Sequence, residues 1–416
     1  MTLFPRLAAI RQPVPTAPLA DVARAVRDEL ARVDLGSRVR PGSRIAVGAG
    51  SRGVAGYALI VGAVVAELRR LGAEPFVFPA MGSHGGATAE GQLAVLAEWG
   101  ITPERMGCPV RSSMEVVQVG ATPSGIAVFC DAAAHASDGI VLVNRVKIHT
   151  DFHGPTESGL TKMMAIGLGK RQGAELIHAR GVRGLREEIP RVAAVQLGRS
   201  PILCGVAIVE DGAHNVSHVQ AVLAADIPRE EPAILERSRR LMAALPVAAC
   251  DLLIVDWIGK DISGGGMDGN IIGRMLIDGE PEPQAPQVGL LLARRLTPAS
   301  HGNATGLGYA DLTTRQLVEA MDAEITRVNV ATSGFPRRGL TPPVFPSDRA
   351  ALEHALELLA NRAPVAPPTV LRIRDTLSLA ELQVSENLLP ELLARPGFEQ
   401  LAPPAQLRFD EDGGLM

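Results

Sequence analysis

The chain of 416 residues is poor in aromatic side chains, which make up 3% of it. Proteins that bind single-stranded nucleic acid stack the bases on such side chains, so the composition argues against this class. Positive charge is not in excess either, because the 41 lysines and arginines are outnumbered by 45 aspartates and glutamates, which gives a net charge of −4. A basic surface for nucleic acid or for an acidic membrane is therefore not predicted.

Cysteine is also scarce: the four cysteines are widely spaced and include no Cys-x-x-Cys pair. This spacing argues against a thiolate zinc site and against a disulfide framework, and it suits a reducing compartment. The longest apolar stretch, 57–68, is too short to span a bilayer. The first residues lack the pattern of a signal peptide, so we expect a cytoplasmic protein without a membrane partner.

Apolar residues, in contrast, are abundant at 46% of the chain, which is typical of a folded globular protein and not of a disordered one. Their patterns predict strands that alternate with helices. Short continuous apolar runs predict buried strands at 44–47, 75–78, 140–143, 202–209 and 252–255. Helical spacing predicts helices at 19–33, 57–68 and 88–99. This alternation indicates an α/β fold with a parallel, doubly wound sheet covered on both faces.

The length is sufficient for two domains, each with its own core. Residues 1–270 are predicted to form an N-terminal α/β domain that contains the doubly wound sheet and carries the catalytic and cofactor residues. Residues 271–416 are predicted to form a smaller C-terminal α/β domain. The tail that follows the proline-rich segment 364–368 is expected to pack back on the first domain.

Ligands of doubly wound sheets bind in the loops after the carboxyl ends of the strands. The first predicted strand is followed by Gly48-Ala49-Gly50-Ser51-Arg52-Gly53. Its glycines would let backbone N–H groups approach an anion, and Arg52 could bind phosphate or carboxylate. A dinucleotide site also needs an acidic residue after the second strand, where the chain instead has Pro79-Ala80-Met81-Gly82-Ser83-His84. A tight turn with a solvated arginine remains the alternative.

Two histidines follow later strands. His84 is flanked by glycines, and it could act as an acid or base or could cap the next helix. His149 is followed four residues later by His153, a spacing that suits zinc when both lie on one helix. The glutamate of the usual metalloprotease motif is missing, however, and Gly154-Pro155 ends any helix, so zinc is not predicted.

Lys162 and His178 complete the set of candidates. Lys162 has apolar neighbours, so either its stem covers apolar surface or its amine is held at a site. His178 could equally be a buried ring whose hydrogen bonds are satisfied. Each residue taken singly fits a structural role, but the order and spacing of the whole set favour a function.

In these residues the chain resembles the nickel-dependent lactate racemase family, whose members racemise or epimerise 2-hydroxyacids. The resemblance covers residues 44–275 well and the remainder loosely. Its motifs are Gly82-Ser83-His84, Lys147-Ile148-His149-Thr150-Asp151-Phe152, Ser158-Gly159-Leu160-Thr161-Lys162 with His178 after it, and Gly259-Lys260-Asp261-Ile262-Ser263-Gly264 with Met267-Asp268-Gly269-Asn270.

The resemblance implies a two-domain α/β fold and a nickel-pincer nucleotide (nickel pyridinium-3,5-bisthiocarboxylate mononucleotide), which binds nickel through two sulfurs and a carbon. His178 matches the histidine that supplies the fourth nickel ligand, and imidazole suits a four-coordinate Ni(II) site. Lys162 matches the lysine that the type enzyme links covalently to the cofactor, a link that not every relative need have. Gly50, Ser51 and Arg52 match the loop near phosphate and substrate.

His84 and His149 match the family's pair of catalytic histidines. Removing the α-hydrogen of a hydroxyacid anion as a proton is difficult, because the adjacent carboxylate cannot readily hold more charge. Hydride transfer to an electrophilic cofactor, while a histidine takes the hydroxyl proton, avoids the carbanion. The two enantiomers present their hydroxyls on opposite sides, so each histidine is the base in one direction and the acid in the other. The resemblance therefore implies an isomerase, a 2-hydroxyacid racemase or epimerase.

One departure from the family concerns the substrate. The type enzyme binds the carboxylate of lactate with a Gln-x-x-Lys pair, at positions where this chain has Gly273 and Leu276. Lys260 and Arg274 could bind the substrate together with Arg52, or they could be ordinary surface charges. We therefore expect the substrate to be a 2-hydroxyacid other than lactate.

Two other classes of function remain open. An NAD(P)-dependent dehydrogenase would use the glycine-rich turn after the first strand, although the missing acidic residue counts against it. A non-catalytic protein that binds the cofactor or a nucleotide would keep the fold and convert no hydroxyacid. The sequence sets neither the particular hydroxyacid nor the oligomeric state.

Overall fold

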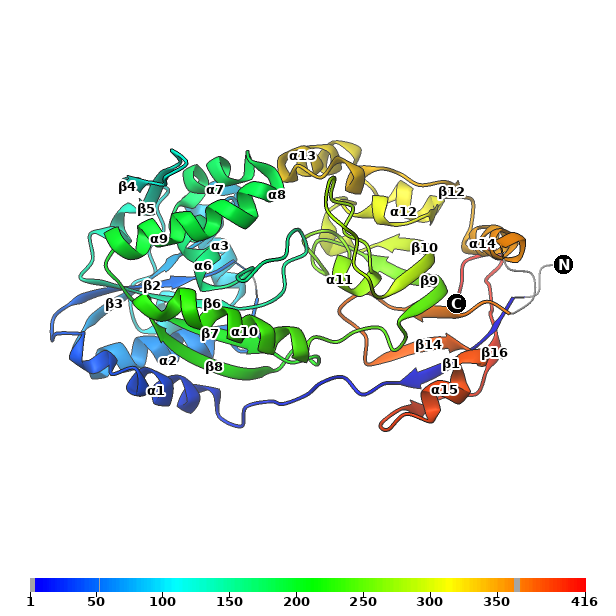
Figure 1. Cartoon of the computed structure of the whole chain (residues 1–416), viewed down its shortest axis with the longest axis horizontal. Helices are drawn as coiled ribbons and strands as arrows, with labels where there is room; N and C mark the ends of the chain where they lie inside the picture. The colour runs from blue at the N-terminus through cyan, green and yellow to red at the C-terminus, as the bar shows by residue number, and fades with distance from the viewer. Residues whose placement is uncertain (1–3, 52, 363–366) are drawn as a thin grey trace. The chain divides into compact units, whose positions relative to one another are not determined.

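The computed structural model describes residues 4–51, 53–362 and 367–416. The chain divides into two compact units, which are coloured along the chain in Figure 1. We call Pro15–Met242 the N-terminal unit, and Ala243–Met416 together with Met1–Val14 the C-terminal unit. The predicted boundary at residue 270 differs from this division, because β9 (Ala249–Ile258) pairs with strands of the C-terminal unit.

A five-stranded sheet forms the centre of the N-terminal unit, in the order β3-β2-β6-β7-β8. Its strands are β2 (Arg44–Ala49), β3 (Glu74–Pro79), β6 (Gly139–Arg145), β7 (Ile202–Glu210) and β8 (Val216–Leu223). The first four are parallel, and β8 is an antiparallel edge strand. The chain places β3 on one side of β2 and β6 on the other. This reversal of strand order is the kind of point where open α/β sheets bind ligands.

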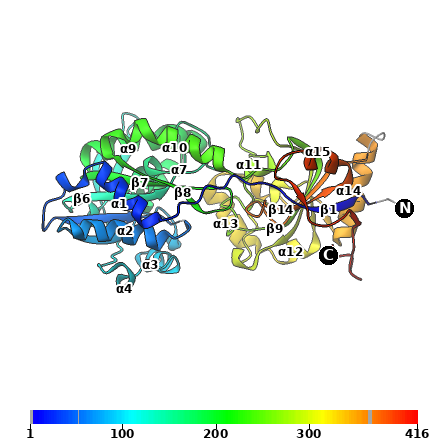
Figure 2. The ribbon, with the colours of Figure 1, turned by 90° about the horizontal axis from the view of Figure 1, so that it is seen from below.

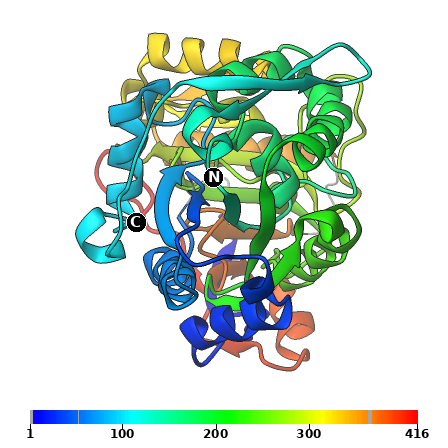
Figure 3. The same cartoon turned by 90° about the vertical axis from the view of Figure 1, so that its left-hand side faces the viewer.

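Helices cover both faces of this sheet. Figure 2 shows α1 (Val22–Arg32) and α2 (Tyr57–Arg70) side by side on one face. The opposite face is covered by α9 (Ile189–Arg199) and α10 (Ile227–Leu241), which are green in Figure 3. The alternation of side chains along β2 explains the two layers, because Ile45 and Val47 join the core of the first face. Ala46 joins the core of the second face.

Shorter elements connect these layers. They are α3 (Ala89–Glu98), α4 (Pro103–Met106), β4 (Val116–Ala121), β5 (Ala127–Asp131), α5 (Ala132–His135), α6 (Leu160–Lys162), η3 (Met163–Gly167), α7 (Lys170–His178), α8 (Gly181–Arg183) and η4 (Gly184–Glu188). Strands β4 and β5 form a separate antiparallel hairpin. The segment η3 is a π-helix that directly follows α6, a departure from α-helical geometry that is frequent at functional sites.

The C-terminal unit contains a nine-stranded sheet in the order β12-β11-β10-β9-β13-β14-β1-β15, with β16 also paired to β1. Beside β9, the strands are β1 (Arg6–Arg11), β10 (Gln287–Leu296), β11 (Leu312–Thr314), β12 (Val344–Phe345), β13 (Val370–Ile373), β14 (Glu381–Ser385), β15 (Glu399–Gln400) and β16 (Ala405–Gln406). The helices with α-helical bonding are α11 (Gly269–Ile272), α12 (Arg315–Glu319), α13 (Ala323–Ser333), α14 (Asp348–Arg362) and α15 (Leu389–Leu393). Strands β12 to β9 and β13 are parallel, whereas β14 and β1 are antiparallel to their neighbours.

The α/β class predicted from the sequence is confirmed, and each predicted strand exists. The strand predicted at 252–255 is β9, which belongs to the sheet of the C-terminal unit and not to the sheet of β2. The tail after the prolines pairs with β9 through β13 and with β1 through β14, while 363–366 lie outside the described residues. Within the described ranges, no helix is both long enough and apolar enough to cross a bilayer.

Candidate active site

The predicted site residues of the N-terminal unit follow three neighbouring strands. Gly50 and Ser51 come after β2, His84 comes after β3, and His149 comes after β6. Because β3 and β6 flank β2 in parallel, the carboxyl ends of all three strands meet at one edge of the sheet. Arg52, predicted to bind cofactor and substrate, lies outside the described residues.

The loop after β2 is fixed by its neighbours. The N–H of Gly50 donates to the hydroxyl of buried Tyr57 at 2.5 Å, and that hydroxyl donates to the backbone of β6 at 2.8 Å. A Cβ at Gly50 would lie 2.9 Å from Oδ1 of Asn144, so any larger residue would require the Asn144 side chain to shift. The indole N–H of Trp99 donates to the carbonyl of Ser51 at 3.3 Å. The predicted cofactor loop is therefore tied to β6 and to the end of α3.

His149 lies in a loop that is closed at its base by Lys147 and Ser158, whose backbones exchange hydrogen bonds of 3.0 and 3.2 Å. The carboxylate of Glu157 lies inside this loop with its side chain fully buried, and it accepts from the N–H of His149 at 2.5 Å. It also pairs with the guanidinium of Arg239 at 3.3 Å. Sequence reasoning missed Glu157, although an acidic residue in a loop rich in glycine, proline and histidine was a usable signal.

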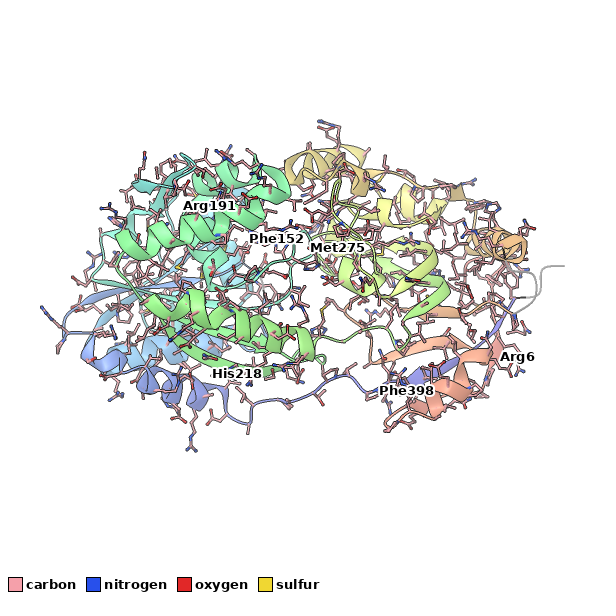
Figure 4. The ribbon with its side chains drawn as sticks, viewed as in Figure 1. Arg6, Phe152, Arg191, His218, Met275 and Phe398 are labelled. Carbon is pink, nitrogen blue, oxygen red and sulfur yellow. The ribbon has the colours of Figure 1, made fainter. Side chains whose placement is uncertain are left out.

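The imidazole of His149 has a partner on each nitrogen. Its Nδ1 accepts from the N–H of Asp151 at 3.0 Å, and its Nε2 is in hydrogen-bond contact with Nζ of Lys162. The ring packs against Phe152, which is labelled in Figure 4, with ring centroids 4.6 Å apart. A lysine ammonium has donors and no acceptor, so which atom donates at the contact between Nε2 and Lys162 depends on the tautomer of the ring and on the charge of the amine.

His178 is the last residue of α7, and its side chain keeps an exposed surface. Enough protein nevertheless surrounds the ring that desolvation lowers its pKa below the ordinary value, and the charge of Lys162 lowers that pKa further. The charge of Asp151 acts in the opposite direction. Lys162 is in contact with His149, and its charge also acts on His178, so His178 lies within electrostatic range of this pair.

His84 is exposed on a loop that packs against the same group of helices. A Cβ at Gly82 would lie 2.8 Å from Cγ2 of Ile166 in η3 and 2.9 Å from Cβ of Ala174 in α7. The loop of His84 therefore lies directly on the helix that ends at His178. The first side chains after β3 are the buried Ala80 and Met81, so the acidic residue of a dinucleotide site is missing there.

The other two candidates, Lys260 and Arg274, belong to the C-terminal unit. The amine of Lys260 donates to the carbonyl of Gly264 at 2.5 Å and to Oδ1 of Asn329 at 2.9 Å. The guanidinium of Arg274 donates to two backbone carbonyls and pairs with Asp311 at 2.7 Å. These internal partners give Arg274 a structural role within its unit, so we leave it out of the proposed substrate site.

Glu231 is a further buried carboxyl that sequence reasoning missed. It lies in α10, and its Oε2 accepts from the N–H of Thr161 at 2.9 Å and from the hydroxyl of the same residue. A Cβ at Gly159 would overlap Oε1 of Glu231, which explains the glycine there. Glu231 therefore fixes the turn α6, whose last residue is Lys162. Burial raises the pKa of this carboxyl, although the hydrogen bonds from Thr161 lower it.

Replacing Glu231 with glutamine is expected to stabilise the protein in a pH-dependent way. Because the pKa of Glu231 is raised in the folded state, its contribution is fully present below the ordinary value of 4.5 and is lost as the pH rises through the folded value. Glutamine does not titrate, so the variant should gain free energy of unfolding over the wild type as the pH rises. Urea unfolding at about pH 4.5 and about pH 8 measures this, and a difference independent of pH would contradict it.

Comparison with known proteins identifies the fold. No family model matches the chain, and neither does any curated protein. Among solved structures, it is similar to the lactate racemase apoprotein from Thermoanaerobacterium thermosaccharolyticum, with a TM-score of 0.55 and 15% identity over 89% of this chain and 99% of that one. It is also similar to a protein from Thermotoga maritima, with a TM-score of 0.50 and 13% identity over 68% and 72% of the two chains. The chain therefore has a lactate racemase-like α/β fold.

Proposed function

We propose that the protein is a racemase or epimerase of a 2-hydroxyacid that works with a nickel-pincer nucleotide. The observation that supports this most directly is the cluster of His149, Lys162 and His178 at the strand-order reversal of a lactate racemase-like sheet. Two of these residues match the family's cofactor contacts, and the third matches one of its acid–base histidines. The alternatives of a dehydrogenase and of a non-catalytic binding protein explain this combination less well.

The residues present suit such a cofactor. His178 offers one accessible imidazole, and its lowered pKa favours the neutral form that binds metals. Among the residues that the structure describes, no group of three or more His, Cys, Asp or Glu side chains could hold a metal ion, so nickel here would take its other ligands from the cofactor. Lys162 would contact the cofactor or be linked to it, and Gly50 and Ser51 would hold its phosphate together with Arg52.

In this proposal the bound cofactor supplies an acceptor for hydride from the α-carbon of the substrate. His84 and His149 move the hydroxyl proton: one takes it as the hydrogen leaves, and the other returns a proton when the flat 2-oxoacid is reduced on its opposite face. His149 is held for this task by the N–H of Asp151, by Phe152 and, through its backbone, by Glu157. Its Nδ1 is bound by the N–H of Asp151, so we assign proton transfer to the other ring nitrogen, Nε2.

Metal content and the absorption spectrum test the cofactor assignment. Protein produced together with the enzymes that make the nickel-pincer nucleotide is expected to contain about one nickel per chain and to show absorption bands that are missing from protein produced without them. A titration with NAD on the same preparation tests the dehydrogenase alternative. Protein that gains no nickel from this co-production, and that binds NAD instead, would contradict the proposal.

Lactate is expected to be a poor substrate relative to larger 2-hydroxyacids. Gly273 has φ +69°, and a Cβ there would overlap the carbonyl oxygen of Pro286, so this position cannot carry the glutamine that the type enzyme uses. Charge-assisted contacts to the carboxylate are worth about 1.5–3 kcal/mol, and lactate has no further polar group through which other residues could replace them. Its kcat/KM is therefore expected to be lower by about tenfold or more than that of acids with such a group. The measurement is kcat/KM over a panel of hydroxyacids, and turnover of lactate equal to the best of them would contradict it.

A further inference from the structure

Lys170 is a buried lysine outside the motifs that carry the resemblance. Lys170 is 0% exposed, and its backbone φ of +51° is a left-handed conformation that is costly for a residue other than glycine. Its amine lies 3.1 Å from the carboxylate of Asp131, which is also buried. The chain contains 37 arginines but four lysines, and the other three, Lys147, Lys162 and Lys260, all lie in those motifs. A buried lysine in a costly backbone conformation points to a specific role for its amine.

The amine of Lys170 connects three segments of the N-terminal unit. It donates to the carbonyl of Pro79, the last residue of β3, at 2.6 Å, and to Oε1 of Gln92 in α3 at 3.2 Å. Gln92 is also 0% exposed, and its Nε2 donates onward to the carbonyls of Met81 at 3.2 Å and Gly82 at 3.1 Å. The buried amine therefore orients the amide that holds the backbone directly after β3.

This network ends at His84. Nε2 of Gln92 also reaches the carbonyl of His84, at 3.5 Å. The side chain of His84 is exposed on a loop rich in glycine, so its position depends on how the backbone of that loop is held. Lys170 is at the same time the first residue of α7, the helix that ends at His178. One side chain thus joins the loop of His84 to the helix of His178.

We propose that Lys170, acting through Gln92, is a positioning residue that fixes His84 relative to His178. This inference deepens the proposed function, and it rests on that function where turnover is concerned. A lysine suits the task because its compact ammonium group has three donors, which the carbonyl of Pro79, the amide of Gln92 and the carboxylate of Asp131 use. The planar guanidinium of arginine is larger, so it does not fit a space where three acceptors surround a single nitrogen atom.

Hydrogen exchange of the apoprotein tests the positioning without the cofactor. The variants are Gln92→Leu and the pair Lys170→Met with Asp131→Asn, in which no unpaired carboxylate is left buried. Both are expected to raise amide exchange in peptides over 80–88 by about tenfold or more and to leave β2 and α2 unchanged. The matched control is Gln196→Leu, because Gln196 is equally buried but donates to the carbonyl of Phe129 at 2.7 Å.

The inference is overturned if neither variant raises amide exchange over 80–88, or if Gln196→Leu raises it as much. In the enzyme loaded with cofactor, kcat should fall by about tenfold or more with KM within about twofold, and combining the variants should cost no more than the worse one alone. Unchanged kcat despite a loosened loop would also overturn it. A wild-type enzyme that converts no hydroxyacid would instead contradict the proposed function, and the exchange result would still decide whether Lys170 holds the loop.

Discussion

Replacing His84 or His149 with alanine is expected to lower kcat for interconversion of the two hydroxyacid enantiomers by about 10³-fold. A positioned general acid or base contributes about 10²–10⁴-fold, and each histidine serves in both directions of the reaction. Neither variant should keep the conversion of one enantiomer into the other in either direction, because every turnover needs one histidine to take a proton and the other to give one. Polarimetry or chiral chromatography of a single enantiomer measures the loss.

A matched control separates this effect from general damage. His218 lies on β8, is partly buried and belongs to none of the motifs, so His218→Ala should leave kcat within about twofold of the wild type. His149 also contacts Lys162, so the nickel content of His149→Ala must be measured with its rate. Full activity in both His84→Ala and His149→Ala, with nickel retained, would contradict the acid–base roles.

The second large effect is expected for His178→Ala, which should lose most of its nickel. In the proposal His178 is the one protein ligand of the metal, and the described residues offer no cluster of side chains that could replace it. We expect nickel per chain to fall to about a tenth of the wild-type value or less, with the absorption bands of the cofactor lost in parallel. Elemental analysis of protein from the same co-production measures this.

His218→Ala again serves as the control, because it removes an imidazole without touching the cluster. Thermal unfolding of the two apoproteins should show that His178→Ala folds, since an exposed side chain at the end of a helix contributes little to the core. Undiminished nickel in a folded His178→Ala would assign the ligand to another residue.

The elements of the N-terminal unit could be predicted because their signals are local. Helix α2 shows its apolar face within 57–68, and β2 shows continuous apolar residues within 44–47, so neither needs knowledge of distant residues. Membership of a sheet is different. Strand β1 pairs with β14, near the other end of the chain, and nothing in the pattern of Arg6–Arg11 specifies that partner. The predicted boundary at 270 misassigned β9 for the same reason.

The site shows the same division between local and distant information. The motifs around His149 and Lys162 could be recognised from the residues beside them, and the structure places these two side chains in contact. The residues that hold the site could not be recognised in this way. Glu231 reaches Thr161 across 70 residues, and Lys170 reaches Pro79 across 91, so only the folded chain shows their contacts.

Conversion of one enantiomer by the loaded enzyme tests the central proposal most directly. Protein with its nickel measured is incubated with single enantiomers of a panel of 2-hydroxyacids, and the product is followed by chiral chromatography. We predict that at least one acid is converted to its mirror image or epimer, without added NAD, at a rate proportional to the nickel content. Protein that carries nickel at about one per chain and leaves every enantiomer of the panel unchanged would contradict the account.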